Sequence, residues 1–238
     1  MNYLENYFAE HAGRLIHKWQ HYFEIYDRHF SRYRGTDVHV VEFGVSHGGS
    51  LQMWKEYFGP HAKIFGIDIN PRCKKLEEEQ SGIFIGDQAD RGFLKTLAER
   101  LPRIDILIDE GGHANEQQIH TYEELFPSNA KEGVYLCEDL HTSYLPEWGG
   151  GYRKRGTFIE SSKTFIDAIH AWHSVQTSRL SVTAFTRSVQ SLHYYSGVLV
   201  IEKRPVDKPF HLKAGTPSVP KFQPPVGLLK RLQGRLKR

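Results

Sequence analysis

The most informative stretch of the chain is residues 104–113, which read IDILIDEGGH. Apolar residues fill four of the five positions from 104 to 108, and three of them are isoleucine, a pattern that predicts a buried parallel strand. Two acids, two glycines and a histidine follow this strand directly. In an open α/β sheet, ligands bind in the crevice outside the carboxyl ends of the strands. The stretch therefore predicts an α/β fold with a polar site at the end of this strand.

A second buried strand is predicted over residues 134–137, and it also ends in two acids. Two neighbouring strands would then bring four carboxylates and the imidazole of His113 to one edge of the sheet. Carboxylate oxygens suit a hard cation, and a histidine can take up a proton near neutral pH. The sequence thus predicts a metal site with a base beside it, which is typical of an enzyme. The four acids are Asp109, Glu110, Glu138 and Asp139.

The wider sequence alternates strands with helices five times, which predicts a doubly wound, Rossmann-like parallel sheet with right-handed crossovers. A helix over about 161–173 follows, and then two strands, 180–187 and 192–202, joined by the short connection 188–191. Five parallel strands followed by such an antiparallel hairpin form the layout of class I methyltransferases. The other predicted strands are 38–43, 63–68, 82–86, 104–109 and 133–138, and the other predicted helices are 50–58, 71–80, 90–100 and 115–126.

Three domains or segments are expected. Residues 1–34 are rich in aromatic residues at helical spacing, which predicts an N-terminal helical cap of about two helices. Residues 35–204 would form the methyltransferase-like domain. Residues 205–238 would form a proline-rich linker and a basic amphipathic tail.

A nucleotide pocket is predicted after the first strand. Residues 42–50 read EFGVSHGGS, and their glycines would let the backbone approach a ligand closely. Asp68 ends the next strand, where a carboxylate commonly accepts hydrogen bonds from ribose hydroxyls. This combination favours an adenosine-containing cofactor, although the glycine motif alone could also serve NAD. The candidate cofactor-binding residues are Glu42, Gly44, Val45, Ser46, Ser50, Asp68, Asp87, Gln88 (the last two at the adenine edge) and Asp109.

Charge is distributed unevenly. Residues 204–238 contain nine Lys and Arg and a single acid, a charge of +8, so the chain's net charge of +3 leaves −5 for residues 1–203. A nucleic-acid-binding domain would carry its basic surface on the folded body, so no nucleic-acid partner is expected. Residues 227–238 place leucines on one face and Lys and Arg on the other, which predicts peripheral contact with anionic lipid; a solvated, frayed tail is the alternative. No secretory signal or membrane span is recognised, and two cysteines fit a reducing cytosol, so we expect a cytoplasmic location, including the inner face of the membrane.

These motifs resemble those of the metal-dependent sugar O-methyltransferases typified by the macrocin and mycinamicin enzymes. The same group includes the cephalosporin hydroxylase-like proteins and the rhamnosyl O-methyltransferases. The resemblance covers about residues 15–203. It is strongest at the two acidic strand ends and in EDLHTSY at 138–144, and it adds KWQHY at 18–22. It implies S-adenosylmethionine as methyl donor, a divalent cation that is usually magnesium, a sugar hydroxyl as acceptor and a homo-oligomer.

The resemblance also implies roles for individual residues. In the motif Asp-Asp-Gly-Ser-His of these enzymes, the second acid ligates the metal and the histidine is the general base; here those positions hold Glu110 and His113. The paired acids of the following strand correspond to Glu138 and Asp139, which would complete the metal site. The chain departs from the pattern in having glutamate at position 110, which leaves open whether Asp109 or Glu110 is the first ligand.

Two other readings stay open. The same cluster could hold iron for a hydroxylase. Such sites usually consist of two histidines and one carboxylate, and only His141 could supply the second histidine. A non-catalytic adaptor that keeps the fold and contacts membranes through its tail is the other alternative. Residues 148–152 could form a mobile loop over the crevice or a plain long connection. The aromatic residues within 18–22 could form part of a lid or could pack from a helix onto the sheet.

Overall fold

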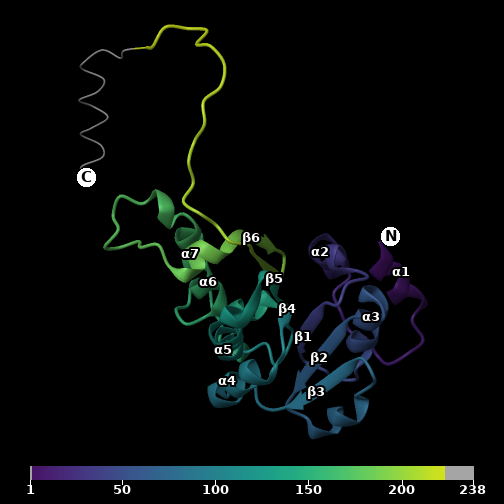
Figure 1. Cartoon of the computed structure of the whole chain (residues 1–238). Helices are drawn as coiled ribbons and strands as arrows, with labels where there is room; N and C mark the ends of the chain where they lie inside the picture. The colour runs from purple at the N-terminus through teal and green to yellow at the C-terminus, as the bar shows by residue number, and fades with distance from the viewer. Residues whose placement is uncertain (1, 223–238) are drawn as a thin grey trace. The chain divides into compact units, whose positions relative to one another are not determined.

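The computed structural model describes residues 2–222, which divide into two units after Asp207. The first unit is an α/β domain built on a seven-stranded sheet (Figure 1). Residues 208–222 of the second unit contain no helix or strand. No helix within the described range is long and apolar enough to cross a membrane. The tail at 227–238, for which lipid contact is predicted, lies outside the described residues.

The strand order of the sheet is β3-β2-β1-β4-β5-β7-β6. The first five strands are parallel to their neighbours, whereas β7 runs antiparallel to both β5 and β6. This arrangement confirms the predicted fold class. Because chain order reverses on either side of β1, the crevice of the sheet lies between the ends of β1 and β4. The strands are β1 (His39–Phe43), β2 (Lys63–Asp68), β3 (Ser81–Ile85), β4 (Ile104–Asp109), β5 (Asn129–Cys137), β6 (Val189–Tyr195) and β7 (Val198–Lys203).

Helices cover both faces of the sheet, as the hydrophobic core shows. One core cluster joins α1 (Tyr3–Glu10), α2 (Tyr22–Phe30) and α3 (Gly49–Phe58) to one face, and a second joins α4 (Arg91–Arg100), α5 (Asn115–Leu125) and α6 (Phe158–Ile169) to the other (Figure 1). Side chains alternate between these clusters along β5 and β7, as the pleat requires. The remaining elements are the short helix α7 (Ala184–Ser188) and the 3-10 turns Ser31–Tyr33, Pro71–Leu76, Phe126–Ser128, Leu140–Tyr144, Pro146–Trp148 and Ala171–His173.

Helix α2 confirms the helical spacing expected of the N-terminal aromatics. Tyr22, Tyr26 and Phe30 recur every four residues and are all buried, because they face the sheet and α3. The Tyr26 ring lies edge-on to Trp54 of α3, with 5.2 Å between ring centroids. These contacts fix α2 against the strand ends that carry the acids, so its tyrosine hydroxyls can reach the site.

The C-terminal hairpin exists, but its predicted strand 180–187 is wrong. Residues 184–188 form α7 instead, and the hairpin consists of β6 and β7 joined by the two residues 196–197. The reason is local: the Thr183 side chain accepts a hydrogen bond from the Thr186 amide and starts a helical turn. A helical turn satisfies the backbone there without a strand partner.

Several element ends also differ from expectation. The helix predicted over 71–80 is a 3-10 turn that stops at Leu76, because the chain then forms a bridge between Glu78 and Ser81. Helix α6 starts at Phe158 because the Thr157 hydroxyl accepts a hydrogen bond from the Glu160 amide. None of these differences moves a strand end that carries a candidate site residue. Cys73 and Cys137 are both buried and unpaired.

Candidate active site

A cavity of about 380 Å³ opens at the crevice between β1 and β4. Its lining comes from the loops after β1, β2, β3 and β4 and from residues 15–18 of the segment that joins α1 to α2. We call this segment, residues 11–21, the N-terminal strap. Nine of the predicted site residues line the cavity: Gly44, Val45, Ser46, Ser50, Asp68, Asp87, Gln88, Glu110 and the predicted base His113.

Asp68 shapes the loop that follows β1. One carboxylate oxygen accepts hydrogen bonds from the backbone amides of Val45 and Ser46 at 3.0 and 2.9 Å, and the other accepts one from Asn70 at 2.8 Å. Gly44 is required at the start of this loop, because it has a φ of +90° and a Cβ there would overlap the carbonyl oxygen of Glu110. The loops after β1 and β4 therefore meet, and the cavity wall passes directly from the predicted nucleotide pocket to the acidic strand end.

Two predicted cofactor-binding acids lie outside the cavity lining. Glu42 is fully buried and accepts hydrogen bonds from the Ser50 hydroxyl at 2.7 Å and the Trp54 indole at 3.0 Å. Asp109 is also buried, and its carboxylate accepts a 2.7 Å hydrogen bond from the Gln88 amide. Burial raises the pKa of Asp109 to about 6. Both acids support residues of the wall.

The strap is held against the start of α3. A Cβ at Gly49 would overlap the backbone carbonyl oxygens of Arg14 and Leu15, so the strap packs directly on the glycine at this helix terminus. Arg14 also bonds to the Leu76 carbonyl at 3.2 Å and pairs with Glu78 at 2.8 Å. One wall of the cavity is therefore formed by residues outside the glycine loop and its neighbours.

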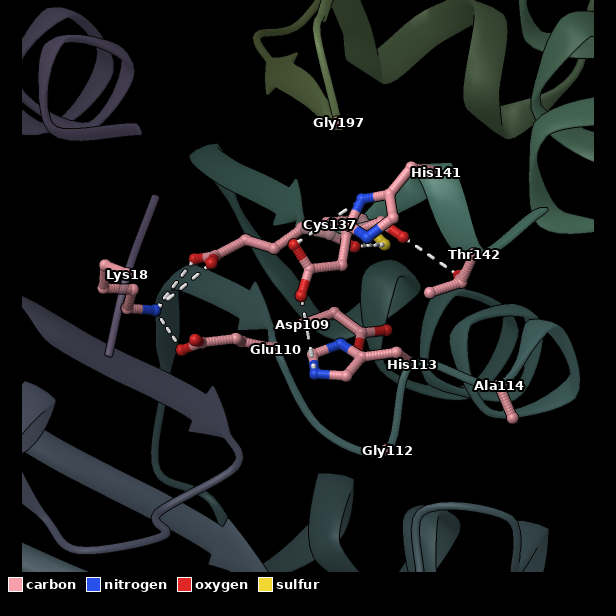
Figure 2. A network of polar contacts seen from close by, with 12 residues as sticks. Lys18, Asp109, Glu110, Gly112, His113, Ala114, Cys137, His141, Thr142 and Gly197 are labelled. Carbon is pink, nitrogen blue, oxygen red and sulfur yellow. Dashed lines mark hydrogen bonds and ion pairs between the residues drawn. The ribbon is translucent and has the colours of Figure 1, made fainter. Parts of the chain in front are cut away.

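Lys18 of the strap reaches into the acidic strand ends (Figure 2). Its ammonium donates a hydrogen bond to Glu110 and lies 3.1 Å from a carboxylate oxygen of Glu138 and 3.7 Å from one of Glu42. The Lys18 side chain is 1% exposed. The Tyr26 hydroxyl of α2 donates a 2.6 Å hydrogen bond to the same carboxylate of Glu138. Carboxylates from β1, β4 and β5 thus converge on one buried lysine.

The single charge of Lys18 does not compensate for these acids. Burial alone would lower the pKa of Lys18, but the charges of Glu110, Glu138 and Glu42 outweigh burial and raise it. Burial raises the pKa of Glu110 and of Glu138 even though the ammonium touches both. The raised pKa values mean that these buried carboxyls tend to hold protons, which a further cation would displace.

Asp139 belongs to a second, adjoining group. Its carboxylate accepts a 2.9 Å hydrogen bond from the Tyr22 hydroxyl, and it lies 3.5 Å from Nε2 of His113 and 3.9 Å from Nδ1 of His141. His113 and Asp139 both have left-handed backbone conformations, with φ of +56° and +54°. Such conformations are uncommon outside glycine and cluster at functional sites. Burial lowers the pKa of His113, which favours the neutral imidazole that a base requires.

The acids fit a divalent cation by their chemistry, since all three predicted ligands offer carboxylate oxygens. Their positions differ from a compact site, because Lys18 holds Glu110 and Glu138 while Asp139 turns to Tyr22 and His113. Within residues 2–222, the one trio of potential ligands with all donor atoms within 4.8 Å of one another lies elsewhere. It consists of His29, His193 and Glu202.

That trio is explained by hydrogen bonding. Nδ1 of His29 contacts Glu202 at 2.7 Å and Nε2 contacts the Tyr195 hydroxyl at 2.9 Å, so both ring nitrogens are engaged. Arg32 also approaches Glu202, at 3.4 Å. The trio therefore ties α2 to the hairpin and leaves no lone pair of His29 open for a metal.

Sequence reasoning did not assign three side chains that reach the acids, namely Lys18, Tyr22 and Tyr26. The spacing of Tyr22 and Tyr26 predicted a packed helix, and both are indeed buried, but their hydroxyls also bond to Asp139 and Glu138. The one available signal was the cluster KWQHY at 18–22, in which a lysine precedes the aromatic face of a helix.

Sequence comparison finds relatives among enzymes that methylate antibiotic sugars. The chain is 34% identical over 207 residues to the 8-demethyl-8-(2-methoxy-alpha-L-rhamnosyl)-tetracenomycin-C 3'-O-methyltransferase of Streptomyces olivaceus, which corresponds to 82% of the chain and 52% of that enzyme. It is 36% identical over 188 residues to the demethylmacrocin O-methyltransferase of Streptomyces fradiae, covering 75% of the chain and 47% of that enzyme. The chain therefore spans about half the length of these curated relatives. No family model matches it.

Structural comparison gives a concordant result. The chain superposes with a TM-score of 0.73 on the MycE methyltransferase from the mycinamycin biosynthetic pathway, solved in complex with Mg, SAH and mycinamycin VI. The sequence identity is 33%, and the match covers 91% of the chain and 56% of MycE. A second structure of MycE, with Mg and SAH, gives the same TM-score at 35% identity over 79% of the chain and 51% of MycE.

Proposed function

Because the chain is a homologue of the macrocin and mycinamicin group of sugar O-methyltransferases, we propose that it transfers a methyl group from S-adenosylmethionine to a hydroxyl of a sugar-containing acceptor. One observation carries the proposal. His113 both lines the cavity of the predicted nucleotide pocket and contacts Asp139 of the acidic group. A donor bound in the cavity and an acceptor bound at Asp139 would therefore meet at one imidazole.

In this proposal the glycine loop and Asp68 bind the donor. The Asp68 carboxylate would accept hydrogen bonds from ribose hydroxyls, and Asp87 and Gln88 would lie along the adenine edge. Gly44, Val45, Ser46 and Ser50 would contact the methionine end, with Glu42 supporting Ser50 from below. The cavity volume of about 380 Å³ is within the range of small-molecule sites.

The proton of the acceptor hydroxyl would move to Nε2 of His113. The acceptor oxygen forms a bond to the methyl carbon, the sulfur–carbon bond breaks, and the sulfur leaves as a neutral thioether, so no acid is needed for the leaving group. The carboxylate of Asp139 stabilises the imidazolium, since it lies 3.5 Å from Nε2. The chain's main tasks are then to orient the hydroxyl for in-line attack and to hold its proton.

Glu110, Glu138 and Asp139 would hold a divalent cation, with Mg²⁺ proposed from their all-oxygen donor set. When bound, Mg²⁺ supplies charge that lowers the pKa of a coordinated hydroxyl and orients it. The convergence of three carboxyl groups around the single ammonium of Lys18 supports this assignment, and the MycE structures contain Mg and SAH. Asp109 is less suited than Glu110 as the first ligand, since its carboxylate already bonds to Gln88 away from Lys18.

Calorimetry and a transfer assay test the proposal together. The chain is titrated with S-adenosylmethionine and with NAD, and it is then incubated with methyl-labelled donor, Mg²⁺ and a panel of glycosides. We expect the chain to bind S-adenosylmethionine and not NAD, and the labelled methyl group to appear in a glycoside. When EDTA removes the metal, no label should be transferred. Binding of NAD in place of S-adenosylmethionine would refute the proposed donor.

Substitution of Asp68 by asparagine should weaken S-adenosylmethionine binding by roughly tenfold to a hundredfold, because hydrogen bonds to a charged acceptor contribute about 1.5–3 kcal/mol. The dissociation constant is measured by calorimetry. Asp90→Asn is the matched control, since Asp90 caps α4 outside the cavity lining and asparagine caps a helix equally well. An unchanged dissociation constant in Asp68→Asn would remove Asp68 from the donor site.

We also propose that residues 227–238 contact anionic lipid at the inner face of the membrane and that the protein forms homo-oligomers. The lipid proposal is supported by the leucines and basic residues of that segment. Deletion of residues 227–238 should abolish sedimentation with anionic liposomes, whereas neutral liposomes should not sediment the full chain. Equal sedimentation of the two chains would contradict the lipid contact. Light scattering of the full chain tests the oligomer.

A further inference from the structure

Two exposed tryptophans contact the two histidines that flank Asp139. The Trp148 ring lies 6.0 Å from the His113 ring at an interplanar angle of 71°, and the Trp19 ring lies 6.0 Å from the His141 ring at 85°. His113 and His141 in turn approach the Asp139 carboxylate at 3.5 and 3.9 Å. The contacts therefore form a chain of five side chains, with an indole at each end and a carboxylate at its centre.

These indoles are unusually accessible for their size. Trp19 is 55% exposed and Trp148 is 37% exposed, whereas Trp54 of the core is fully buried. An edge-on contact with a histidine covers only part of an indole, so apolar ring surface stays open to solvent. Exposed apolar surface beside convergent polar groups is typical of a ligand-binding site.

Both indoles are carried by anchored backbone. The Trp148 carbonyl accepts a 3.0 Å hydrogen bond from the buried Asn115 side chain, which also accepts hydrogen bonds from the Ser143 hydroxyl and the Phe158 amide. Trp19 follows Lys18, whose ammonium is bound to the acids. The Trp19 carbonyl accepts a 3.0 Å hydrogen bond from the Tyr22 amide. The tryptophans are therefore positioned before any ligand arrives, which lowers the entropy cost of binding.

We propose that Trp19 and Trp148 form the acceptor subsite and pack against the apolar C–H surface of one pyranose ring. This inference rests on the proposed methyl transfer and assigns the surface that recognises its sugar. A pyranose has apolar C–H patches and a rim of hydroxyls. With the patches against indole surface, one hydroxyl of the rim reaches Asp139 and Nε2 of His113.

Saturation-transfer NMR on the full chain with SAH and Mg²⁺ tests the subsite. The probes are methyl α-L-rhamnopyranoside and methyl α-D-glucopyranoside, with catechol as a planar aromatic diol of another acceptor class. We expect saturation of the ring C–H protons of both glycosides. The signal should weaken by about fivefold or more in Trp19→Ala and in Trp148→Ala, as the loss of an aromatic packing surface predicts.

The controls separate recognition from folding. Tyr152→Ala removes an aromatic residue that is 78% exposed in the same connection as Trp148 and should leave the signal unchanged. Trp148→Phe should restore most of the signal, and SAH affinity should be equal in all variants. In the transfer assay, the tryptophan variants should raise KM for the glycoside more than they lower kcat.

Three outcomes would overturn the subsite: no saturation of either glycoside in the wild type, saturation of catechol alone, or full glycoside signal in both alanine variants. Failure of the proposed methyl transfer gives a different result. In that case the glycoside signal would persist and depend on the tryptophans, but no label would move from S-adenosylmethionine to a glycoside.

Discussion

Substitution of His113 by alanine is expected to lower kcat for methyl transfer by about 10²- to 10⁴-fold, the contribution typical of a positioned general base. The imidazole lines the donor cavity and also contacts Asp139. Burial lowers its pKa, which favours the neutral form that can accept a proton. Donor binding should change little, because the hydrogen bonds that shape the glycine loop come from Asp68. Single-turnover rates at saturating donor and calorimetry with S-adenosylmethionine measure the two effects separately.

The control for this experiment is His170→Ala. His170 ends α6 on the exposed surface, and its removal should leave both kcat and donor affinity unchanged. If His113→Ala lost donor affinity and kcat in equal proportion, His113 would be a donor-binding residue and its assignment as the base would be wrong. Retention of near-normal kcat would have the same consequence for the base.

Substitution of Lys18 by methionine should destabilise the metal-free protein by about 3–5 kcal/mol, since removing one partner of a buried ion pair leaves uncompensated charge. Glu110, Glu138 and Glu42 would all lose their shared cation. The same change should increase the stabilisation that Mg²⁺ gives, because the ammonium no longer competes with the metal for Glu110 and Glu138. Urea unfolding with and without Mg²⁺ measures both quantities.

Lys163→Met provides the comparison for Lys18. Lys163 pairs with Glu160 on the exposed surface of α6, so its loss should change the free energy of unfolding by no more than about 1 kcal/mol. If Lys18→Met unfolded at the same urea concentration as the wild type, the buried network would not contribute to stability. If Mg²⁺ stabilised the variant less than the wild type, Lys18 would be required for the metal site.

Hydrophobic periodicity was sufficient to predict the sheet. The apolar runs at 104–109 and 134–137, and their spacing from predicted helices, identified five parallel strands because buried parallel strands need apolar residues on both faces. The hairpin was predicted in kind but not in position. Residues 180–187 contain alternating apolar residues, yet a local helix cap at Thr183 decided their conformation. Single hydrogen bonds of this sort carry little periodic signal.

The candidate site was predictable where residues follow strand ends. Asp68, Glu110, His113 and Glu138 lie at the edge that topology assigns to ligands, because the carboxyl ends of parallel strands meet there. What topology does not determine is the direction of each side chain. Glu138 and Asp139 are neighbours in sequence, but one faces Lys18 and the other His113, since Asp139 has a left-handed backbone conformation.

Lys18 lies 92 residues from Glu110 in the chain, so no motif links the two. Its position depends on how the strap crosses the start of α3, which in turn depends on the absence of a side chain at Gly49. Contacts between residues so far apart in the sequence depend on tertiary packing. Hydrophobic periodicity therefore does not predict them.

The N-terminal strap contributes both to the cavity wall and to the buried acidic group. Leu15 and Ile16 form part of the wall around the proposed donor, while Lys18, two residues further on, pairs with Glu110 and Glu138. Any displacement of the strap would therefore change the wall of the cavity and separate the ammonium from its carboxylates together.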